Sequence, residues 1–313
     1  MNRKAVAATI WSLAYGSLGL AWALGAPRFP WGATDPDPDR ALSILATATP
    51  EVAGWWIAGL GAAAAVAVLT SARWFLYPLA ATLILVIPDS RLMMGLAYSP
   101  LLAVKPLTGW PDADVSLADA WPWEVVNQLL CVLGGVLLIA AAWRPRRTGW
   151  TSPESAARWG RWAVYVAVTV PLIYCSTRWA WALGIPLGVD REFLVEGAKD
   201  APGIWLAGAY LATFGALGGL LTLGLIQRWG EVFPRWIPFL RGRRVPPKLA
   251  VVPATLVAII IAEAGFTYLR KALSGEWLME EWGAWLPETF WPVWGGALAA
   301  AALAYHLRRR VQP

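Results

Sequence analysis

Eight long apolar runs constrain this chain more than any other feature of its sequence. A helix of about 20 residues crosses the roughly 30 Å of hydrocarbon in a bilayer. Of the 313 residues, 58% are hydrophobic and only 15% are charged, whereas soluble domains carry about a quarter charged residues. We therefore expect an all-α, polytopic membrane protein. Its eight spans are expected near residues 5–26, 52–71, 74–98, 123–143, 162–184, 202–227, 249–270 and 289–307.

Histidine and cysteine are too scarce for several classes of enzyme. The chain has one histidine, His306, and two cysteines, Cys131 and Cys175, which both lie inside apolar runs. A single histidine, placed close to the basic tail Arg308–Arg310, excludes haem ligation, His-rich di-iron sites, HExxH zinc chemistry and a Ser-His dyad, and the two separate cysteines exclude a CxxC redox motif. We expect no metal and no cofactor.

Basic residues are distributed unevenly between the two sides of this topology. If the N-terminus is cytoplasmic, the inner segments hold 17 of the 26 basic residues but only two of the 20 acidic ones, Glu154 and Glu231. This split follows the positive-inside rule, and it attributes the net charge of +6 to membrane anchoring and not to nucleic-acid binding. We expect both termini to be cytoplasmic.

Four sequence patterns recur in the same order in the two halves of the chain. Tyr15 is followed seven residues later by Trp-Ala-Leu-Gly-Ala-Pro, and Tyr174 is followed seven residues later by Trp-Ala-Leu-Gly-Ile-Pro. The other pairs are Trp56 and Trp205 (each in Trp-x-Ala-Gly), Arg73-Trp74 and Arg228-Trp229, and Trp121-Pro122 and Trp291-Pro292. We interpret them as two parallel four-helix repeats, 1–147 and 148–313, in one membrane domain. Chance similarity between Ala- and Leu-rich helices is the competing interpretation.

Five polar residues are expected at a similar depth near the outer face of the membrane. Counted at 1.5 Å per residue from the inner helix ends, Asp89, Glu263 and Arg178 lie about 21–24 Å across, and Asn127 and Gln128 enter from the outer side. Charges within a bilayer are costly and are therefore functional candidates. One interpretation is a ligand site in which Arg178 faces Asp89 or Glu263. The other is a purely structural role, either as an ion pair between helices or as acids whose side chains reach the water at the outer face.

Two local predictions concern the same residues. Tyr174, Arg178 and Trp181 are spaced i, i+4 and i+7, so they share one helix face, and the guanidinium can lie over the indole. Pro88, directly before Asp89, frees a backbone carbonyl and is expected to bend the third span.

The outer surface is expected to be aromatic and acidic. By this topology, about 15 of the 23 tryptophans lie at or beyond the outer boundary. The outer loops hold 14 acidic residues: Asp35, Asp37, Asp39, Asp112, Asp114, Asp119, Asp190, Glu192, Glu196, Asp200, Glu276, Glu280, Glu281 and Glu288. Such a vestibule suits an amphipathic cation, a lipid or an isoprenoid better than an anion.

The inner loop 228–248 is amphipathic, basic and interrupted by prolines. We expect it to lie on the anionic inner leaflet, and docking of a cytoplasmic protein partner is the alternative.

Two sequence segments are informative: Trp179-Ala-Trp-Ala-Leu-Gly-Ile-Pro-Leu-Gly188 and Gln227-Arg-Trp-Gly-Glu-Val-Phe-Pro-Arg-Trp236. They resemble segments of uncharacterised Trp-rich multi-pass membrane proteins of actinobacteria, and the resemblance covers most of the chain. The resemblance implies a location in the bacterial plasma membrane and no particular activity.

Three functions fit these observations. The leading one is a transporter-like protein that binds a lipid or amphipathic molecule through Asp89, Glu263, Arg178, Asn127, Gln128, Tyr174 and Trp181. The second is a membrane-embedded enzyme that uses Asp89 or Glu263 as general acid on a lipid or isoprenoid. The third is an accessory or scaffold subunit of a membrane complex.

Overall fold

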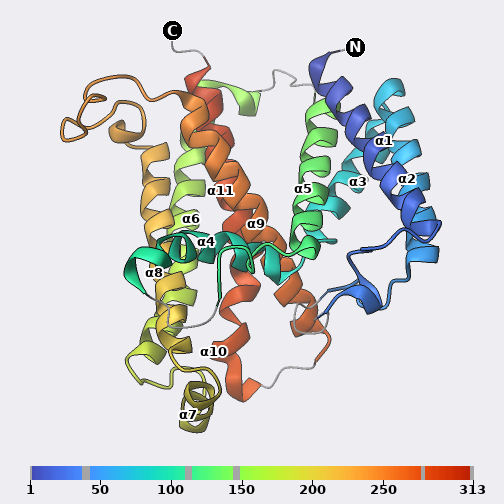
Figure 1. Ribbon diagram of the computed structural model, residues 1–313. Coiled ribbons are helices and arrows are strands. Elements are labelled where there is room, and N and C mark those ends of the chain that lie inside the picture. Colours follow the sequence, from blue (N-terminus) through green and yellow to red (C-terminus); the bar gives the residue numbers. More distant parts are fainter. Residues whose placement is uncertain (1, 37–42, 110–114, 144–148, 276–278, 311–313) are drawn as a thin grey trace. The chain divides into compact units, whose positions relative to one another are not determined.

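The protein is all-α, as expected (Figure 1). The computed structural model describes residues 2–36, 43–109, 115–143, 149–275 and 279–310. Within these ranges the chain forms eleven α-helices, several short 3-10 turns and one isolated antiparallel bridge between Val232 and Arg244. The helices divide into two compact units, Met1–Pro145 (unit 1) and Arg146–Pro313 (unit 2), and each is described by itself.

Unit 1 consists of α1 (Arg3–Ala23), α2 (Pro50–Thr70), α3 (Arg73–Leu85), α4 (Ser90–Thr108) and α5 (Trp123–Ala142). Helix α1 packs against α2 and α5, and α3 packs against α5.

The contact between α1 and α2 depends on glycine. A Cβ atom on Gly61 would come within 2.6 Å of the Ser12 carbonyl oxygen, and one on Gly54 would come within 2.6 Å of the Ala23 backbone nitrogen. Small residues therefore let these two apolar helices approach closely, which is a common way for membrane helices to associate.

Unit 2 consists of α6 (Pro153–Ala182), α7 (Arg191–Asp200), α8 (Ile204–Thr222), α9 (Pro247–Leu273), α10 (Trp282–Trp285) and α11 (Trp291–Arg309). Helix α6 packs against α8 and α11, and α9 packs against α11. The Ser152 side chain caps α6 by accepting a hydrogen bond of 3.2 Å from the Ser155 backbone N–H.

Five of these helices are long and apolar enough to cross a membrane: α1, α2, α5, α9, and α8 with its 3-10 extension to Leu225. Helices α3 and α4 together form a sixth candidate, bent by 58° at the break between Leu85 and Ser90. The bend predicted at Pro88 is therefore confirmed.

The expected number of eight spans is not reached among the described residues. The runs 162–184 and 289–307 fall mostly within α6 and α11, but Trp, Tyr and Arg lower the mean hydropathy of these two helices below that of the five candidate spans. The chain is a multi-pass membrane protein by helix length and hydropathy.

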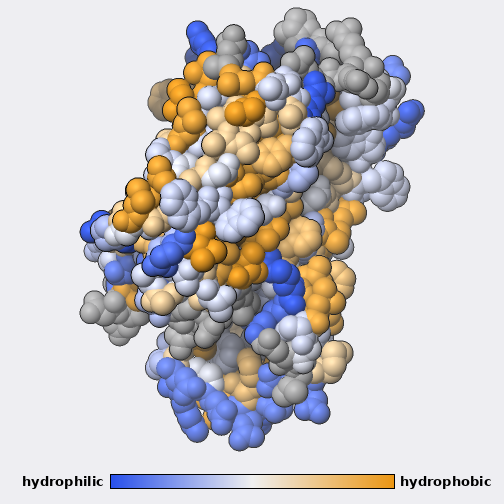
Figure 2. Space-filling view, turned by 90° about the vertical axis from the view of Figure 1, so that its right-hand side faces the viewer, coloured by the Kyte–Doolittle hydropathy of each residue, from blue (hydrophilic) through white to orange (hydrophobic). Residues whose placement is uncertain are grey.

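Large apolar side chains cover much of the surface. Trp74 on α3, Leu69 on α2 and Leu249 on α9 are all exposed, and Figure 2 shows broad hydrophobic areas on the face that it presents. Such a surface fits a lipid environment, because a soluble monomer rarely exposes large contiguous apolar patches.

Candidate functional site

The first polar network of interest lies at the break between α3 and α4. Asp89 is the N-cap of α4 and is fully buried, and its side chain accepts a hydrogen bond of 3.1 Å from the Arg91 backbone N–H. The break leaves backbone groups without helical partners, and a capping aspartate satisfies one of them.

Arg91 joins Asp89 to a second buried carboxylate. Its Nε and Nη2 atoms lie 3.0 and 2.7 Å from the two carboxylate oxygens of Asp89. Its Nη1 and Nη2 atoms each lie 2.7 Å from an oxygen of Asp35, which follows the short turn Gly32–Thr34. One planar guanidinium thus bridges two carboxylates, an arrangement that suits arginine and not lysine.

Gln128 on α5 completes this Asp89 network. Its Oε1 accepts from the Asp89 backbone N–H at 3.1 Å, and its Nε2 donates to the Asp89 carboxylate at 2.7 Å. The Asp89 carboxylate therefore accepts hydrogen bonds from Arg91 at Oδ1 and from both Arg91 and Gln128 at Oδ2. An acid that is engaged in this way is poorly placed to protonate a substrate.

Asn127, the residue before Gln128, lies in an aromatic cluster of unit 1. Its Oδ1 accepts from the Tyr15 hydroxyl at 2.9 Å, and Tyr15 packs edge-on against Trp22 at 6.3 Å. Within the described residues, the buried Nδ2 of Asn127 and the buried Nε1 of Trp31 have no hydrogen-bond partner.

The second network surrounds Arg178 on α6, in unit 2. The guanidinium pairs with the Glu288 carboxylate and donates to the Gly283 carbonyl at 2.9 Å. It also lies over the rings of Tyr174 and Trp181, with its central carbon 4.6 and 4.3 Å from the ring centroids. The cation–π contact predicted from the helical spacing is confirmed.

Glu288 lies in the short turn Pro287–Phe290, just before α11, and is buried. Burial raises the pKa of its carboxyl to about 7, and the nearby Arg178 acts in the opposite direction. One oxygen contacts Arg178, whereas the other, Oε2, has no hydrogen-bond partner among the described residues.

Aromatic rings extend this Arg178 network along α11. The Trp291 ring packs edge-on against Tyr174 at 5.2 Å and against Tyr268 at 5.6 Å. Trp294 follows one turn later and lies near Gly215 on α8. Both indole N–H groups are buried, and neither has a partner within the part of the chain that the structure describes.

Glu263 on α9 is fully buried and accepts a hydrogen bond of 3.3 Å from Thr267, one turn further along the helix. Thr267 in turn accepts from Arg270 at 3.2 Å. Glu263 therefore belongs to a polar stripe on α9.

The partners expected for the buried charges need correction. Arg178 is expected from its depth to face Asp89 or Glu263, but it forms an ion pair with Glu288, and Asp89 forms one with Arg91. The expected residues fall into two groups, with Asp89, Asn127 and Gln128 in unit 1 and Tyr174, Arg178, Trp181 and Glu263 in unit 2.

Two acids assigned to an open vestibule are also corrected. Asp35 and Glu288 are buried in ion pairs, so they do not contribute to an exposed acidic surface. Five further vestibule acids lie outside the described residues: Asp37, Asp39, Asp112, Asp114 and Glu276.

Sequence reasoning missed Arg91, although a signal for it was present. Pro-Asp-Ser-Arg is typical of a helix start, with Asp as N-cap, and it places an arginine within reach of the cap. No local sequence pattern predicts the ion pairs of Asp35 and Glu288, because their arginine partners are 56 and 110 residues away.

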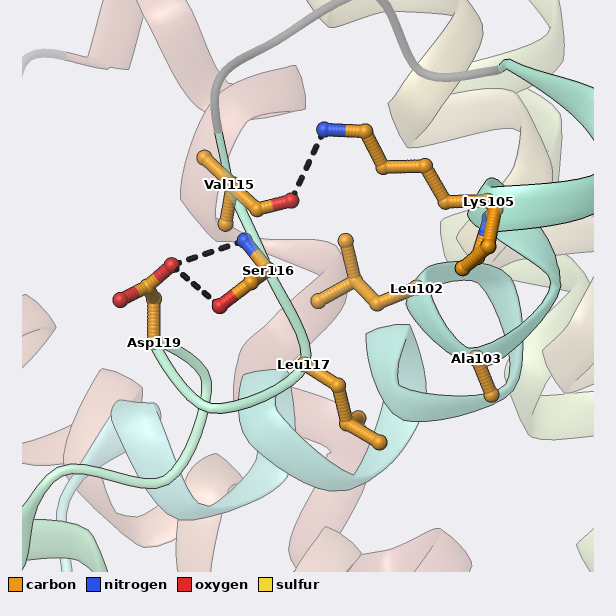
Figure 3. Close-up of a pocket in the computed structure, with 8 residues that line it drawn as sticks. Leu102, Ala103, Lys105, Val115, Ser116, Leu117 and Asp119 are labelled. Carbon is orange, nitrogen blue, oxygen red and sulfur yellow. Dashed lines mark hydrogen bonds between the residues drawn. The ribbon is translucent and has the colours of Figure 1, made fainter.

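A surface pocket of about 440 Å³ lies at the C-terminal end of α4 (Figure 3). Its polar groups bond to one another: Lys105 donates to the Val115 carbonyl at 2.9 Å, and the Ser116 hydroxyl and backbone N–H donate to Asp119. The Lys105–Val115 hydrogen bond holds the loop against α4, and the Ser116–Asp119 bonds lie within the loop.

No metal site is evident in the described ranges, where no three His, Cys, Asp or Glu side chains come together. Comparisons with protein-family models, with curated proteins and with solved structures found no match to this chain.

Proposed function

We propose that this protein is transporter-like and binds a lipid or another amphipathic small molecule, with the Arg178 network and its aromatic surroundings as the binding site. The observation that supports this most directly is a set of three buried polar atoms without hydrogen-bond partners among the described residues: Glu288 Oε2, Trp291 Nε1 and Trp294 Nε1. Leaving such an atom unsatisfied costs about 1–3 kcal/mol.

The chemistry of these atoms defines the polar part of the ligand. Glu288 Oε2 accepts a hydrogen bond, and it therefore calls for a hydroxyl or amine donor. The indoles of Trp291 and Trp294 donate, and they call for an oxygen acceptor. A headgroup that carries both kinds of group meets these needs.

The surroundings define the apolar part. Tyr174, Trp181, Tyr268 and Trp291 present aromatic surface next to the Arg178–Glu288 pair. Small-molecule sites commonly combine such apolar walls with a few convergent polar groups. An amphipathic molecule with a short polar head matches this combination.

The helix order within each unit supports the repeat that we propose for the chain. In unit 1, α1 packs on α2 and α5, and α3 packs on α5; in unit 2, α6 packs on α8 and α11, and α9 packs on α11. If α4 is set aside, three pairwise contacts of unit 1 (α1–α2, α1–α5 and α3–α5) thus correspond in chain order to three of unit 2 (α6–α8, α6–α11 and α9–α11). Parallel repeats of this kind are common among transporters.

Native mass spectrometry of the purified protein in mild detergent tests the binding site. We expect a co-purifying lipid or amphiphile with the wild type, and about thirtyfold weaker binding when Trp291→Phe and Trp294→Phe are combined, because two hydrogen bonds of about 1 kcal/mol each are lost. Trp159→Phe is the matched control, since its indole N–H already donates to the Trp150 carbonyl at 3.1 Å.

A polypeptide that co-purifies without any small molecule would favour a scaffold and overturn the proposal. If a small molecule is found, uptake into proteoliposomes separates transport from binding alone. Release of a chemically modified lipid would indicate an enzyme.

A further inference from the structure

The segment between α8 and α9 forms a hairpin over residues 231–245. Three hydrogen bonds join its backbone. The Phe233 N–H donates to the Arg243 carbonyl at 3.0 Å, the Gly242 N–H donates to the Phe233 carbonyl at 3.0 Å, and the Val245 N–H donates to the Glu231 carbonyl at 2.9 Å. Val232 and Arg244 form the antiparallel bridge. In Figure 1 this orange segment extends from the helices of unit 2 at upper left.

The base of the 231–245 hairpin is attached to the last turns of α11. The Tyr305 hydroxyl donates to the Gly230 carbonyl at 2.7 Å, and Arg308 reaches both Glu231, at 3.3 Å, and the Leu225 carbonyl. Arg309 donates to the Val245 carbonyl at 3.1 Å. Both strands of the hairpin are thus fixed to a single helix end.

The tip of the hairpin, by contrast, exposes aromatic side chains. Trp236 is 79% exposed and Phe239 is 94% exposed. Phe239 has a φ of +64°, a left-handed conformation that is uncommon for residues other than glycine. Two large aromatic side chains, three residues apart, are therefore exposed at this tip.

Basic residues surround these aromatic rings. Arg235, Arg241 and Arg243 are exposed on the hairpin, and the segment 228–248 has six basic residues and one acidic residue. Each arginine or lysine near an anionic bilayer surface adds to the electrostatic attraction. Aromatic rings next to basic side chains are typical of groups that lie at the boundary between lipid headgroups and acyl chains.

We propose that the tip of the 231–245 hairpin inserts into the interface of an anionic bilayer. Trp236 and Phe239 enter the boundary between headgroups and acyl chains, and Arg235, Arg241 and Arg243 bind lipid phosphates. A charged lipid surface fits both the small apolar tip and the three exposed arginines. The proposal is independent of the ligand site at Arg178.

A fluorescent label on Ile237→Cys, between the two aromatic residues, tests this in the full-length protein. Labelling is selective, because both native cysteines are buried. The protein is placed in nanodiscs of phosphatidylcholine alone or mixed with phosphatidylglycerol, and each type also contains a lipid with a nitroxide quencher on its upper acyl chain. We expect at least about threefold stronger quenching in the anionic discs, weakened by high salt.

Charge-reversal variants identify the source of the effect. Arg235→Glu, Arg241→Glu and Arg243→Glu together should abolish the difference between the two kinds of disc. Arg191→Glu with Lys199→Glu on the exposed surface of α7 is the matched control and should leave the difference unchanged.

Two outcomes would overturn the proposal. One is an absence of quenching in both kinds of disc, or equal quenching in both. The other is a co-purifying polypeptide that shields the label from a water-soluble quencher, which would make the hairpin a protein-docking site.

Discussion

Gln128 forms two hydrogen bonds with Asp89, one with its backbone N–H and one with its carboxylate, where the helical path between α3 and α4 is interrupted. A single amide side chain thus satisfies both a free backbone donor and a buried charge. These two hydrogen bonds attach the break between α3 and α4 to α5.

The Gln128 pair predicts a clear loss of stability. Gln128→Leu keeps the size of the side chain but leaves the buried Asp89 N–H unpaired, and we expect it to lower the free energy of unfolding by about 2 kcal/mol. Thermal unfolding in detergent measures this. The neighbouring Leu129→Ala, at an exposed position, is the control and should change little. Equal melting temperatures for Gln128→Leu and the wild type would contradict the structural role.

Arg91 is expected to be irreplaceable by lysine. A lysine ammonium can reach Asp35 or Asp89 but cannot span both carboxylates as the guanidinium does. Arg91→Met should cost about 3–5 kcal/mol, because it leaves buried carboxylates without their arginine. If Arg91→Met does not fold, Arg91→Lys still provides a test by its intermediate melting temperature. Arg158→Met, at an exposed position on α6, is the control.

Glu288 makes stability depend on pH. Its pKa is about 7 in the folded protein, above its ordinary value, so the folded state retains a proton that the unfolded chain releases between about pH 4.5 and 7. The stabilisation from this group is complete below about pH 4.5 and is lost as the pH rises through 7. The shift corresponds to at most about 3 kcal/mol.

Unfolding measured between pH 4.5 and 8 tests this. Glu288→Gln should remove the component of the pH dependence that is centred in this window, whereas Glu280→Gln, at an exposed position, should retain it. The same slope in Glu288→Gln and in the wild type would show that another group titrates.

The charge distribution predicts the orientation in the membrane. Reporter fusions at both termini should give cytoplasmic signals, and a reporter inserted in α7 (Arg191–Asp200) should give an external one. A periplasmic N-terminus would reverse every assignment of inner and outer loops made from the sequence.

Contacts between residues close together in the sequence could be predicted better than contacts between residues far apart. The contact of Arg178 with Trp181 follows from a spacing of three residues on one helix, and the bend at Pro88 follows from one side chain. The Arg178–Glu288 pair could not be predicted in this way, because it joins α6 to a turn 110 residues later. Hydropathy placed Glu288 and Asp35 in loops, where exposure is the usual expectation, and gave no sign that tertiary packing buries them.

The 58° bend between α3 and α4 also determines whether unit 1 crosses the membrane an even or an odd number of times. Helix α3 has 13 residues and is therefore about 20 Å long, too short to cross the hydrocarbon alone. If α4 completes the crossing, unit 1 traverses the membrane four times and α6 begins on the side where α1 begins. If the pair re-enters on its own side, the number of crossings becomes odd and α6 begins on the opposite side. One short bend thus decides on which side of the membrane the second half of the chain starts, and an accessibility label at Ser152 would distinguish the two topologies.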